Sequence, residues 1–196
     1  MPERHATDVV TAVVFDYRGF DTMGEEFILF AAAAGTALLM RQTRGGSRGT
    51  DPSPASDSLR VLAAPLAGAL VVLGVYVAVH GYVTPGGGFQ GGVVLAAAPV
   101  TVFLAGGAAA YRRLIVGRAI DLVEGIALAV FVAVGLAGLA AGGGFLHDLL
   151  PLGKPGTIGS AGTIAVLNDI TALAVGAGFL LFFAEFLEEI APGRGR

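Results

Sequence analysis

The sequence contains no cysteine and no tryptophan, and only 14% of its 196 residues are charged. Without cysteine there is no disulfide framework, no thiolate metal site and no thiol redox motif. The net charge of -3 supplies no basic face to neutralise the phosphates of a nucleic acid. The sequence also shows no nucleophile beside a base, no cluster of metal ligands and no phosphate-binding loop. We therefore expect no enzyme, no catalytic residue, no metal site, no cofactor and no nucleic-acid partner.

Apolar residues and glycine are abundant instead. Hydrophobic residues make up 55% of the chain, glycine occurs 31 times, and the mean hydropathy is +0.77. An ordinary soluble domain has about 25% charged residues. A chain this apolar is suited to lipid, where backbone polar groups must be satisfied within helices or closed barrels. The composition therefore predicts an integral membrane protein.

Five apolar segments can cross about 30 Å of hydrocarbon, which takes about 20 helical residues. The first begins near Asp21 or Thr22 and runs to Met40. The others cover residues 59–79, 89–111, 120–141 and 164–186. Residues 8–16 are too few for a span and predict a short helix at or near the membrane surface. The expected fold class is therefore all-α, a polytopic membrane protein with about five transmembrane helices.

Basic residues gather in alternate connections, and such residues are retained on the cytoplasmic side of a membrane. Residues 41–60 and 112–118 are rich in arginine, whereas residues 81–88 contain no lysine or arginine and residues 142–162 contain only Lys154. With five spans, this pattern predicts an N-terminus outside and a cytoplasmic C-terminus. We expect the protein to be a multi-pass protein of the plasma membrane.

A polar stretch divides the chain into two parts. Residues 42–58 are rich in Gly, Ser, Thr, Asp and Pro, a composition typical of a flexible linker. We expect this linker to be cytoplasmic. Before it comes an N-terminal segment, residues 1–41, with the short helix and the first span. After it come a four-helix membrane domain, residues 59–190, and a tail, residues 191–196.

Glu25 and Glu26 lie about one turn inside the first predicted span. They can stabilise the helix start, with Asp21 or Thr22 as N-cap, because Thr22 and Glu25 have the capping-box spacing. Alternatively, one glutamate faces the interior of a complex and handles a cation or a proton, since acids within a membrane are costly and are usually functional. Glu25 and Glu26 are therefore the first ion-path candidates, and the nearby Asp21 is another.

Two further polar residues are ion-path candidates. Asp169, next to Asn168, lies about a turn and a half into the last span, where burial of an acid is costly. His80 ends the second span and can exchange protons near neutral pH, although a packing role at the interface is the commoner use of such a histidine.

Other residues in the spans favour structural interpretations. Asp121 and Glu124 share one helical face, with Arg118 one turn before Asp121, and we interpret them as an exposed ion pair near a helix start. Pro99 lies in the middle of the third span, where it either kinks the helix or serves packing alone.

The most unusual segment is a glycine-rich stretch at residues 80–92, between two apolar runs. Its motif residues are Pro85, Gly86, Gly87, Gly88, Phe89, Gly91 and Gly92. It lacks the Lys-Ser/Thr ending of a P-loop and is therefore no nucleotide site. We expect an entry into the third span on the outer side, where small residues let that helix approach a partner closely.

This stretch, HGYVTPGGGFQGG, resembles the signature of the B subunit of the Mrp (Mnh) multisubunit cation/proton antiporters. Residues 153–157, 160–163 and 167–169 resemble the same family's loop before its last helix, and the similarity covers roughly residues 59–189. The N-terminal residues 9–25, VVTAVVFDYRGFDTMGE, resemble the C-terminal end of the A subunit of these antiporters. That region is similar to a small subunit of membrane-bound hydrogenases.

The resemblance implies a subunit of a transporter that exchanges cytoplasmic Na+ for external H+. Its partners would be large proton-pumping subunits related to those of complex I, together with small membrane subunits. The chain would not pump alone and would contribute to the cation path, through Glu25 or Glu26, or to assembly. Two alternatives stay open: a purely structural scaffold, and a subunit of a redox-driven ion-pumping complex such as a membrane-bound hydrogenase.

Overall fold

The structure, a computed structural model, describes residues 4–43, 56–115 and 117–190. Within these ranges the chain is helical and contains no strand. Two short elements come first, α1 (Val9–Ala12) and the π-helix η1 (Val13–Tyr17). The long helices are α2 (Gly19–Thr43), α3 (Asp57–Val79), α4 (Gly88–Leu114), α5 (Gly117–Ala140) and α6 (Gly162–Ile190).

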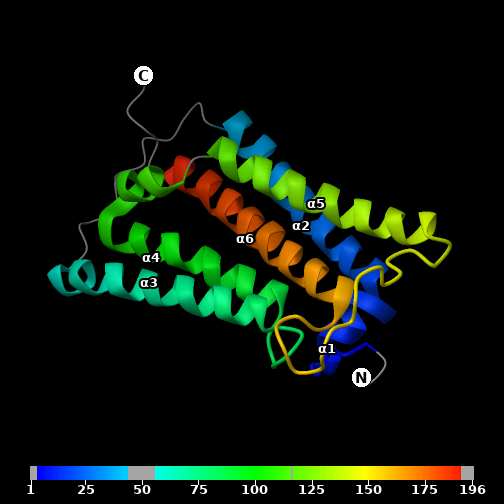
Figure 1. The fold of residues 1–196 in the computed structure, drawn as a ribbon. Coiled ribbons are helices and arrows are strands. Elements are labelled where there is room, and N and C mark those ends of the chain that lie inside the picture. The colour runs from blue at the N-terminus through cyan, green and yellow to red at the C-terminus, as the bar shows by residue number, and fades with distance from the viewer. Residues whose placement is uncertain (1–3, 44–55, 116, 191–196) are drawn as a thin grey trace.

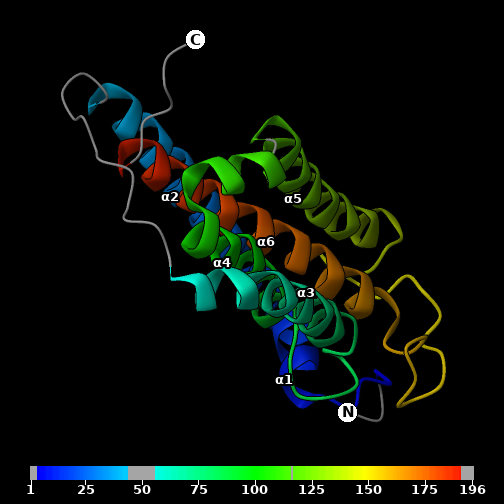
Figure 2. The same cartoon turned by 90° about the vertical axis from the view of Figure 1, so that its left-hand side faces the viewer.

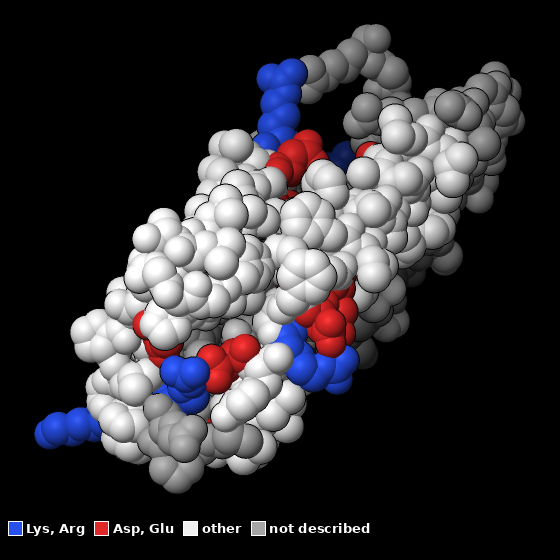
Figure 3. Space-filling model, turned by 90° about the vertical axis from the view of Figure 1, so that its right-hand side faces the viewer, with Lys and Arg blue, Asp and Glu red and all other residues white. Residues whose placement is uncertain are grey.

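Five helices of the described part are long and apolar enough to cross a membrane. Their most apolar windows have mean hydropathies from 1.4 in α2 to 2.3 in α3 and α5. Many large apolar side chains face outward, among them Val61 and Val72 of α3, which are 73% and 71% exposed. On the face in Figure 3, charged side chains form a few clusters on a largely uncharged surface. The predicted all-α fold with five membrane-spanning helices is confirmed.

Helix α6 is the centre of the bundle. It contacts α2, α3, α4 and α5, whereas α3 packs mainly against α4. Figures 1 and 2 show α6 with α2 and α5 on one side and α4 with α3 on the other. The start of α2 and the end of α6 lie at opposite ends of the bundle (Figure 1), as an odd number of spans requires.

Two predicted boundaries need correction. Helix α2 begins at Gly19, two residues before Asp21, so neither Asp21 nor Thr22 is its N-cap. The helices also extend into both ends of the predicted linker, because α2 continues to Thr43 and α3 begins at Asp57. Ser56 caps α3 by accepting a hydrogen bond from the Leu59 N–H. The middle of the linker, residues 44–55, and the tail, residues 191–196, lie outside the described residues.

Helix α4 is interrupted, but not at its proline. Gly107 has φ +71° and ψ -173°, a conformation that glycine adopts without the steric cost a Cβ would bring. Pro99 lies in the regular helical part of α4, as the packing interpretation predicts. The break in this helix therefore follows from a glycine near its C-terminal end.

The short N-terminal helix is packed into the protein. Ala12 is fully buried, Phe15 is 2% exposed, and the Phe15 ring centroid lies 6.5 Å from that of Phe131 in α5. Both belong to an apolar cluster at one end of the bundle, which also contains Tyr82, Leu146 and Leu167. The segment predicted to lie at the membrane surface thus turns its apolar side toward the loops and helix ends of this cluster.

Candidate functional site

The two adjacent glutamates of α2 have different surroundings. Glu26 is buried, with 2% of its surface exposed, and its Oε1 accepts a hydrogen bond from the hydroxyl of Thr171 in α6. Its Oε2 is also buried and has no hydrogen-bond partner. A carboxyl group held inside an apolar bundle with one free oxygen is the arrangement expected of a group that binds a proton or a cation.

Glu25, by contrast, is exposed at the wall of a cavity. The cavity has a volume of about 220 Å³ and lies between the N-terminal elements and the glycine-rich stretch. Its lining residues are Val10, Thr11, Val14, Phe15, Thr22, Glu25, Gly86, Gly87, Gly88, Phe89 and Gln90. The structure therefore brings the motif residues and one candidate acid to a single cavity.

The π-helix η1 forms part of this cavity wall and is fixed to α2. The hydroxyl of Thr22, a buried residue, donates a hydrogen bond of 2.5 Å to the carbonyl of Val14 in η1. The Arg18 N–H bonds to the carbonyl of Val13, five residues back, which is the π-helical pattern. Short π-helical turns occur frequently at functional sites, and this one lies beside the cavity that Glu25 lines.

Asp21 lies at the surface and is paired. Its Oδ2 is 2.6 Å from an Arg18 side-chain nitrogen, and both side chains are more than half exposed. An exposed pair of this kind contributes little to stability. The geometry therefore gives Asp21 a surface ion pair, and it does not bring Asp21 to Glu26.

Asp169 lies beside the main polar junction of the bundle, which is formed by its neighbour Asn168. Asn168 is fully buried. Its Oδ1 accepts from the Gly88 N–H at 2.8 Å, and its Nδ2 donates to the Ala78 carbonyl at 2.7 Å and to Asp169 Oδ1 at 3.2 Å. These bonds satisfy an unpaired N–H at the start of α4 and a carbonyl at the end of α3. Asp169 itself is half-buried.

His80 is held at the end of α3. Its ring stacks on Tyr76 with ring centroids 4.3 Å apart, and its Nδ1 lies 3.1 Å from the Tyr76 carbonyl. These contacts are those of a packing role at the helix end, which the sequence predicts as the commoner use of such a histidine. The geometry does not place its ring at the cavity or beside Glu26.

The glycine-rich stretch lets α4 lie directly against its neighbours. A Cβ at Gly88 would be 2.2 Å from the carbonyl oxygen of Asn168 and 2.9 Å from the Cβ of Thr171. One at Gly92 would be 2.8 Å from the carbonyl oxygen of Ala172, and one at Gly91 would be 2.7 Å from the Cβ of Ala78. Real Cβ atoms are not found at such distances, so close packing of α4 on α3 and α6 depends on these glycines.

The loop between α3 and α4 is bound from two sides. From the N-terminal segment, the Thr11 hydroxyl donates to the Gly81 carbonyl at 2.6 Å, and the N–H groups of Thr7 and Asp8 bond to the Tyr82 carbonyl. From the other side, the Tyr82 hydroxyl donates to the Ile158 carbonyl at 2.5 Å. Burial and the nearby Asp169 carboxylate raise the pKa of Tyr82 above its ordinary value of 10.0.

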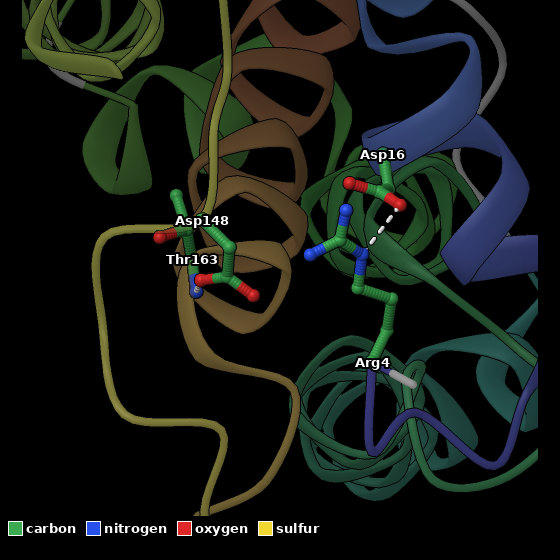
Figure 4. A network of polar contacts seen from close by, with 4 residues as sticks. All are labelled: Arg4, Asp16, Asp148 and Thr163. Carbon is green, nitrogen blue, oxygen red and sulfur yellow. Dashed lines mark hydrogen bonds and ion pairs between the residues drawn. The ribbon is translucent and has the colours of Figure 1, made fainter. Parts of the chain in front are cut away.

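The second signature segment forms the start of α6. Asp148 Oδ1 accepts from the Thr163 N–H at 2.7 Å, and the Thr163 hydroxyl oxygen accepts from the Leu149 N–H at 2.8 Å. Figure 4 shows Asp148 and Thr163 beside each other and, nearby, the Arg4 side chain directed at Asp16 of η1, with Arg4 Nε 2.8 Å from Asp16 Oδ2. The contacts account for Asp148 and Thr163 as helix-capping residues.

Glu124 differs from the sequence-based interpretation. We expected an exposed ion pair, but Glu124 is only 4% exposed, and no ion pair between Arg118 and either acid occurs among the described residues. Asp121 is exposed. The interpretation is wrong for Glu124 because α6 covers its side of α5, which the spacing of charges within α5 cannot reveal.

Sequence reasoning thus missed three buried polar residues, Asn168, Thr171 and Glu124, as parts of the site. All three are polar residues within apolar helices that also contain many small residues. In membrane proteins this combination is typical of a helix–helix contact, and it is the sequence feature that could have identified them. No group of three or more His, Cys, Asp or Glu side chains in the described residues can hold a metal ion. The arrangement can therefore offer single acids and hydroxyls to a proton or a cation.

A comparison with family models identifies the family. Residues 58–181 match the family described as a domain related to the MnhB subunit of Na+/H+ antiporter. The uncharacterized protein MJ1307 of Methanocaldococcus jannaschii is 28% identical over 191 residues, which cover 86% of this chain and 72% of that protein.

Two solved structures share the fold. A chain of the membrane-bound sulfane sulfur reductase, an archaeal respiratory membrane complex, is similar with a TM-score of 0.80 and 33% identity over 94% of this chain and 80% of that chain. A chain of the Mrp complex from Dietzia sp. DQ12-45-1b is similar with a TM-score of 0.78 and 24% identity over 99% of this chain, but over 22% of that chain. The chain belongs to the MnhB family and is a multi-pass membrane subunit of a multisubunit complex.

Proposed function

We propose that this protein is a membrane subunit of a cation/proton antiporter that exchanges cytoplasmic Na+ for external H+, and that it contributes an acidic group to the ion path. The observation that carries the proposal is Glu26, which is 2% exposed within a helix long enough to span a bilayer and has one unpartnered oxygen. Burying an acid in a membrane is costly, and such acids mark ion or proton pathways. The family, whose description names a Na+/H+ antiporter, supports the choice of ions.

The cavity supports a route by which cations or protons reach Glu26. Glu25 precedes Glu26 in α2 and lines the cavity with the glycine-rich stretch. The exposed carboxylate attracts cations at the end of the bundle where α2 begins, and the buried carboxyl follows within the same helical turn. We propose that this end faces outward and that the protein lies in the plasma membrane, because the helix ends that flank the arginine-rich connections, the end of α2 and the starts of α3 and α5, lie at the opposite end (Figure 1).

The N-terminal segment and the four-helix domain act together in this proposal. Glu26 belongs to the segment that resembles the A subunit, and Thr171 belongs to the part that resembles the B subunit. Their hydrogen bond joins the two parts within one bundle. The fold of the Mrp chain, which matches almost all of this chain, supports the two parts as one packed unit.

A second candidate function is a subunit of a redox-driven ion-pumping complex. It is favoured by the 33% identity to a chain of an archaeal respiratory membrane complex, over most of both chains. The same buried acid would serve in either complex, because proton or cation movement is common to both. The energy source, redox chemistry or an existing ion gradient, would reside in the partner subunits.

The experiment is transport by the complex that copurifies with this chain, reconstituted in lipid vesicles. Antiport predicts that an imposed Na+ gradient alone drives H+ movement, and that replacing both glutamates (Glu25→Gln with Glu26→Gln) abolishes it while the subunits still copurify. Ion movement only on addition of an electron donor would favour the redox-driven candidate. Unchanged transport by the double variant would leave a scaffold role, in which only changes that separate the helices, such as Gly88→Leu, reduce assembly.

A further inference from the structure

A second carboxylate is buried in the bundle, and no part of the proposed ion path uses it. Glu124 of α5 is 4% exposed, and Glu26 of α2 is 2% exposed. Neither forms an ion pair among the described residues. An uncompensated charge in an apolar interior is costly, so each of these carboxyl groups must be satisfied by a proton or by a cation.

Both acids face one stripe of α6. Glu26 is bonded to Thr171, and Glu124 Oε1 lies 2.8 Å from the place that a Cβ would occupy on Gly178. Leu29, one turn after Glu26, approaches the same place at 3.3 Å. Residues seven apart lie on the same face of a helix, and the buried Ala174 stands between them. On the α6 side, the junction of α2, α5 and α6 is therefore lined by small side chains, and on the α2 side the Leu29 side chain lies between the two carboxyl groups.

Glu26 and Glu124 lie at different depths along the bundle. Thr171 and Gly178 are separated by about 10 Å along α6, at 1.5 Å per residue. Glu26 follows the start of α2 by seven residues, and Glu124 follows the start of α5 by seven, about 10 Å in each case. Because α2 and α5 start at opposite ends of the bundle (Figure 1), the two acids split about 30 Å of hydrocarbon into three similar steps.

Each buried acid has an exposed acid near it, on the side toward its own end of the bundle. At the end where α2 starts, Glu25 lines the cavity. At the other end, Asp121 is exposed one turn before Glu124. The acids are single groups about 10 Å apart, and no metal-binding cluster occurs in the described residues. A metal cation takes several oxygen ligands at once, whereas one carboxyl group suffices to hold one proton.

We infer that the α2, α5 and α6 junction is a proton-transfer path from the Glu25 cavity through Glu26 and Glu124 to Asp121. This inference rests on the proposed function and assigns the proton, rather than the metal cation, to this chain. A proton leaves one Glu26 oxygen for Glu124 and is replaced from the cavity side, so that charge balances at each step. Since about 10 Å exceeds one hydrogen bond, this path requires bridging water molecules in addition to the Thr171 hydroxyl.

The test uses the purified complex in lipid vesicles, with proton and sodium flux measured separately. Glu124→Gln and Glu26→Gln should each lower proton flux about 100-fold or more, the range of a positioned proton-transfer group. The double variant should be no slower than the slower single variant, because the groups act in series. Asp57→Asn, which changes an exposed carboxylate at the start of α3, is the matched control and should leave the flux unchanged.

Proton flux in the Glu124→Gln complex equal to that of the Asp57→Asn control would overturn the path. The proposed function would still stand if Glu26→Gln abolished exchange in the same preparation, and it would fail together with the path if neither change had an effect. Infrared difference spectra give a readout besides transport: a protonated carboxyl band that responds to an imposed proton gradient should disappear in Glu124→Gln.

A second variant covers the case in which Glu124→Gln does not assemble. Gly178→Ala keeps both acids but places a methyl group 2.8 Å from Glu124 Oε1, so it should displace that carboxyl and lower proton flux about tenfold or more. Gly125→Ala adds the same methyl group to α5 where it meets nothing within 4 Å. Equal proton flux in these two variants would overturn the path.

Discussion

Glu26 and Thr171 are hydrogen-bonded to each other although 145 residues separate them in the chain. Both side chains are almost fully buried, and the bond joins α2 to the central helix α6. It is one of several polar contacts between the N-terminal segment and the four-helix domain, and it joins two long helices. It also fixes one carboxyl oxygen and leaves the other without a partner.

Thr171→Val is expected to impair transport more than folding. The change keeps the shape of the side chain but removes the only hydrogen bond to Glu26 in the described structure. Loss of a hydrogen bond to a buried charged group costs about 1.5–3 kcal/mol, equivalent to a shift of one to two decades in an equilibrium constant. Transport by the vesicle-reconstituted complex should fall about tenfold or more, whereas Thr171→Ser, which retains the hydroxyl, should stay near the unmodified rate. Equal rates for the two variants would contradict this role.

Asn168→Leu should destabilise the bundle. It would leave the Gly88 N–H, which is bonded to Asn168, without a partner in a buried site, whereas the Ala78 carbonyl would keep only its bond from the Gly81 N–H at 3.0 Å. An unsatisfied buried group costs about 1–3 kcal/mol, so the loss should be about 1–3 kcal/mol. Thermal unfolding of the purified complex measures it, with Asn168→Asp as a graded control that keeps the acceptor for Gly88 N–H. A melting temperature unchanged by Asn168→Leu would show that these bonds do not hold α3 and α4 to α6.

The number and approximate ends of the spans followed from hydropathy, because a helix in lipid needs a long apolar run whatever it packs against. The short-range details did not follow in the same way. Glycine at position 107, and not Pro99, interrupts α4, since a proline in a membrane helix can keep helical angles when neighbours satisfy the freed carbonyl. Helix α2 starts before the predicted capping residues, because the Arg18 carbonyl accepts the N–H groups of Asp21 and Thr22 and the Val14 carbonyl in the π-helix accepts the Thr22 hydroxyl.

The site was predicted only in part, for a physical reason. Sequence placed Glu25 and Glu26 together, but adjacent helical residues point about 100° apart, and only the position of α6 decides which is buried. Glu124 looked like the partner of Arg118 within one helix, and it is the covering helix that buries it. The sequence did not distinguish Asn168 from its neighbour Asp169 as a site residue. The hydrogen bonds that give Asn168 its role are made to the ends of two helices far away in the chain.

Gly88→Ala should weaken the contact between α4 and α6. The added methyl group would meet the backbone oxygen of Asn168 at 2.2 Å, and backbone cannot move aside as a flexible side chain can. Overpacking of this kind typically costs about 1–3 kcal/mol. Gly68→Ala in α3 is the control, because its Cβ would meet nothing within 4 Å. Yield and melting temperature of the copurified complex should drop for Gly88→Ala alone, and equal losses in both variants would contradict a specific packing role.

Tyr82 should make the complex sensitive to alkaline pH. Burial, and then the Asp169 carboxylate, raise its pKa above the ordinary 10.0, so the folded protein holds the phenol proton more tightly than the unfolded chain. The stabilisation is therefore complete below pH 10 and is lost as the pH rises through the folded pKa. Tyr82→Phe removes this dependence and also the hydrogen bond to Ile158, so it should lower the melting temperature at neutral pH and flatten its decline above pH 10. Tyr17→Phe, at a side chain that is 58% exposed, should preserve the decline of the unmodified complex. If both variants decline alike, the alkaline sensitivity arises from groups other than Tyr82.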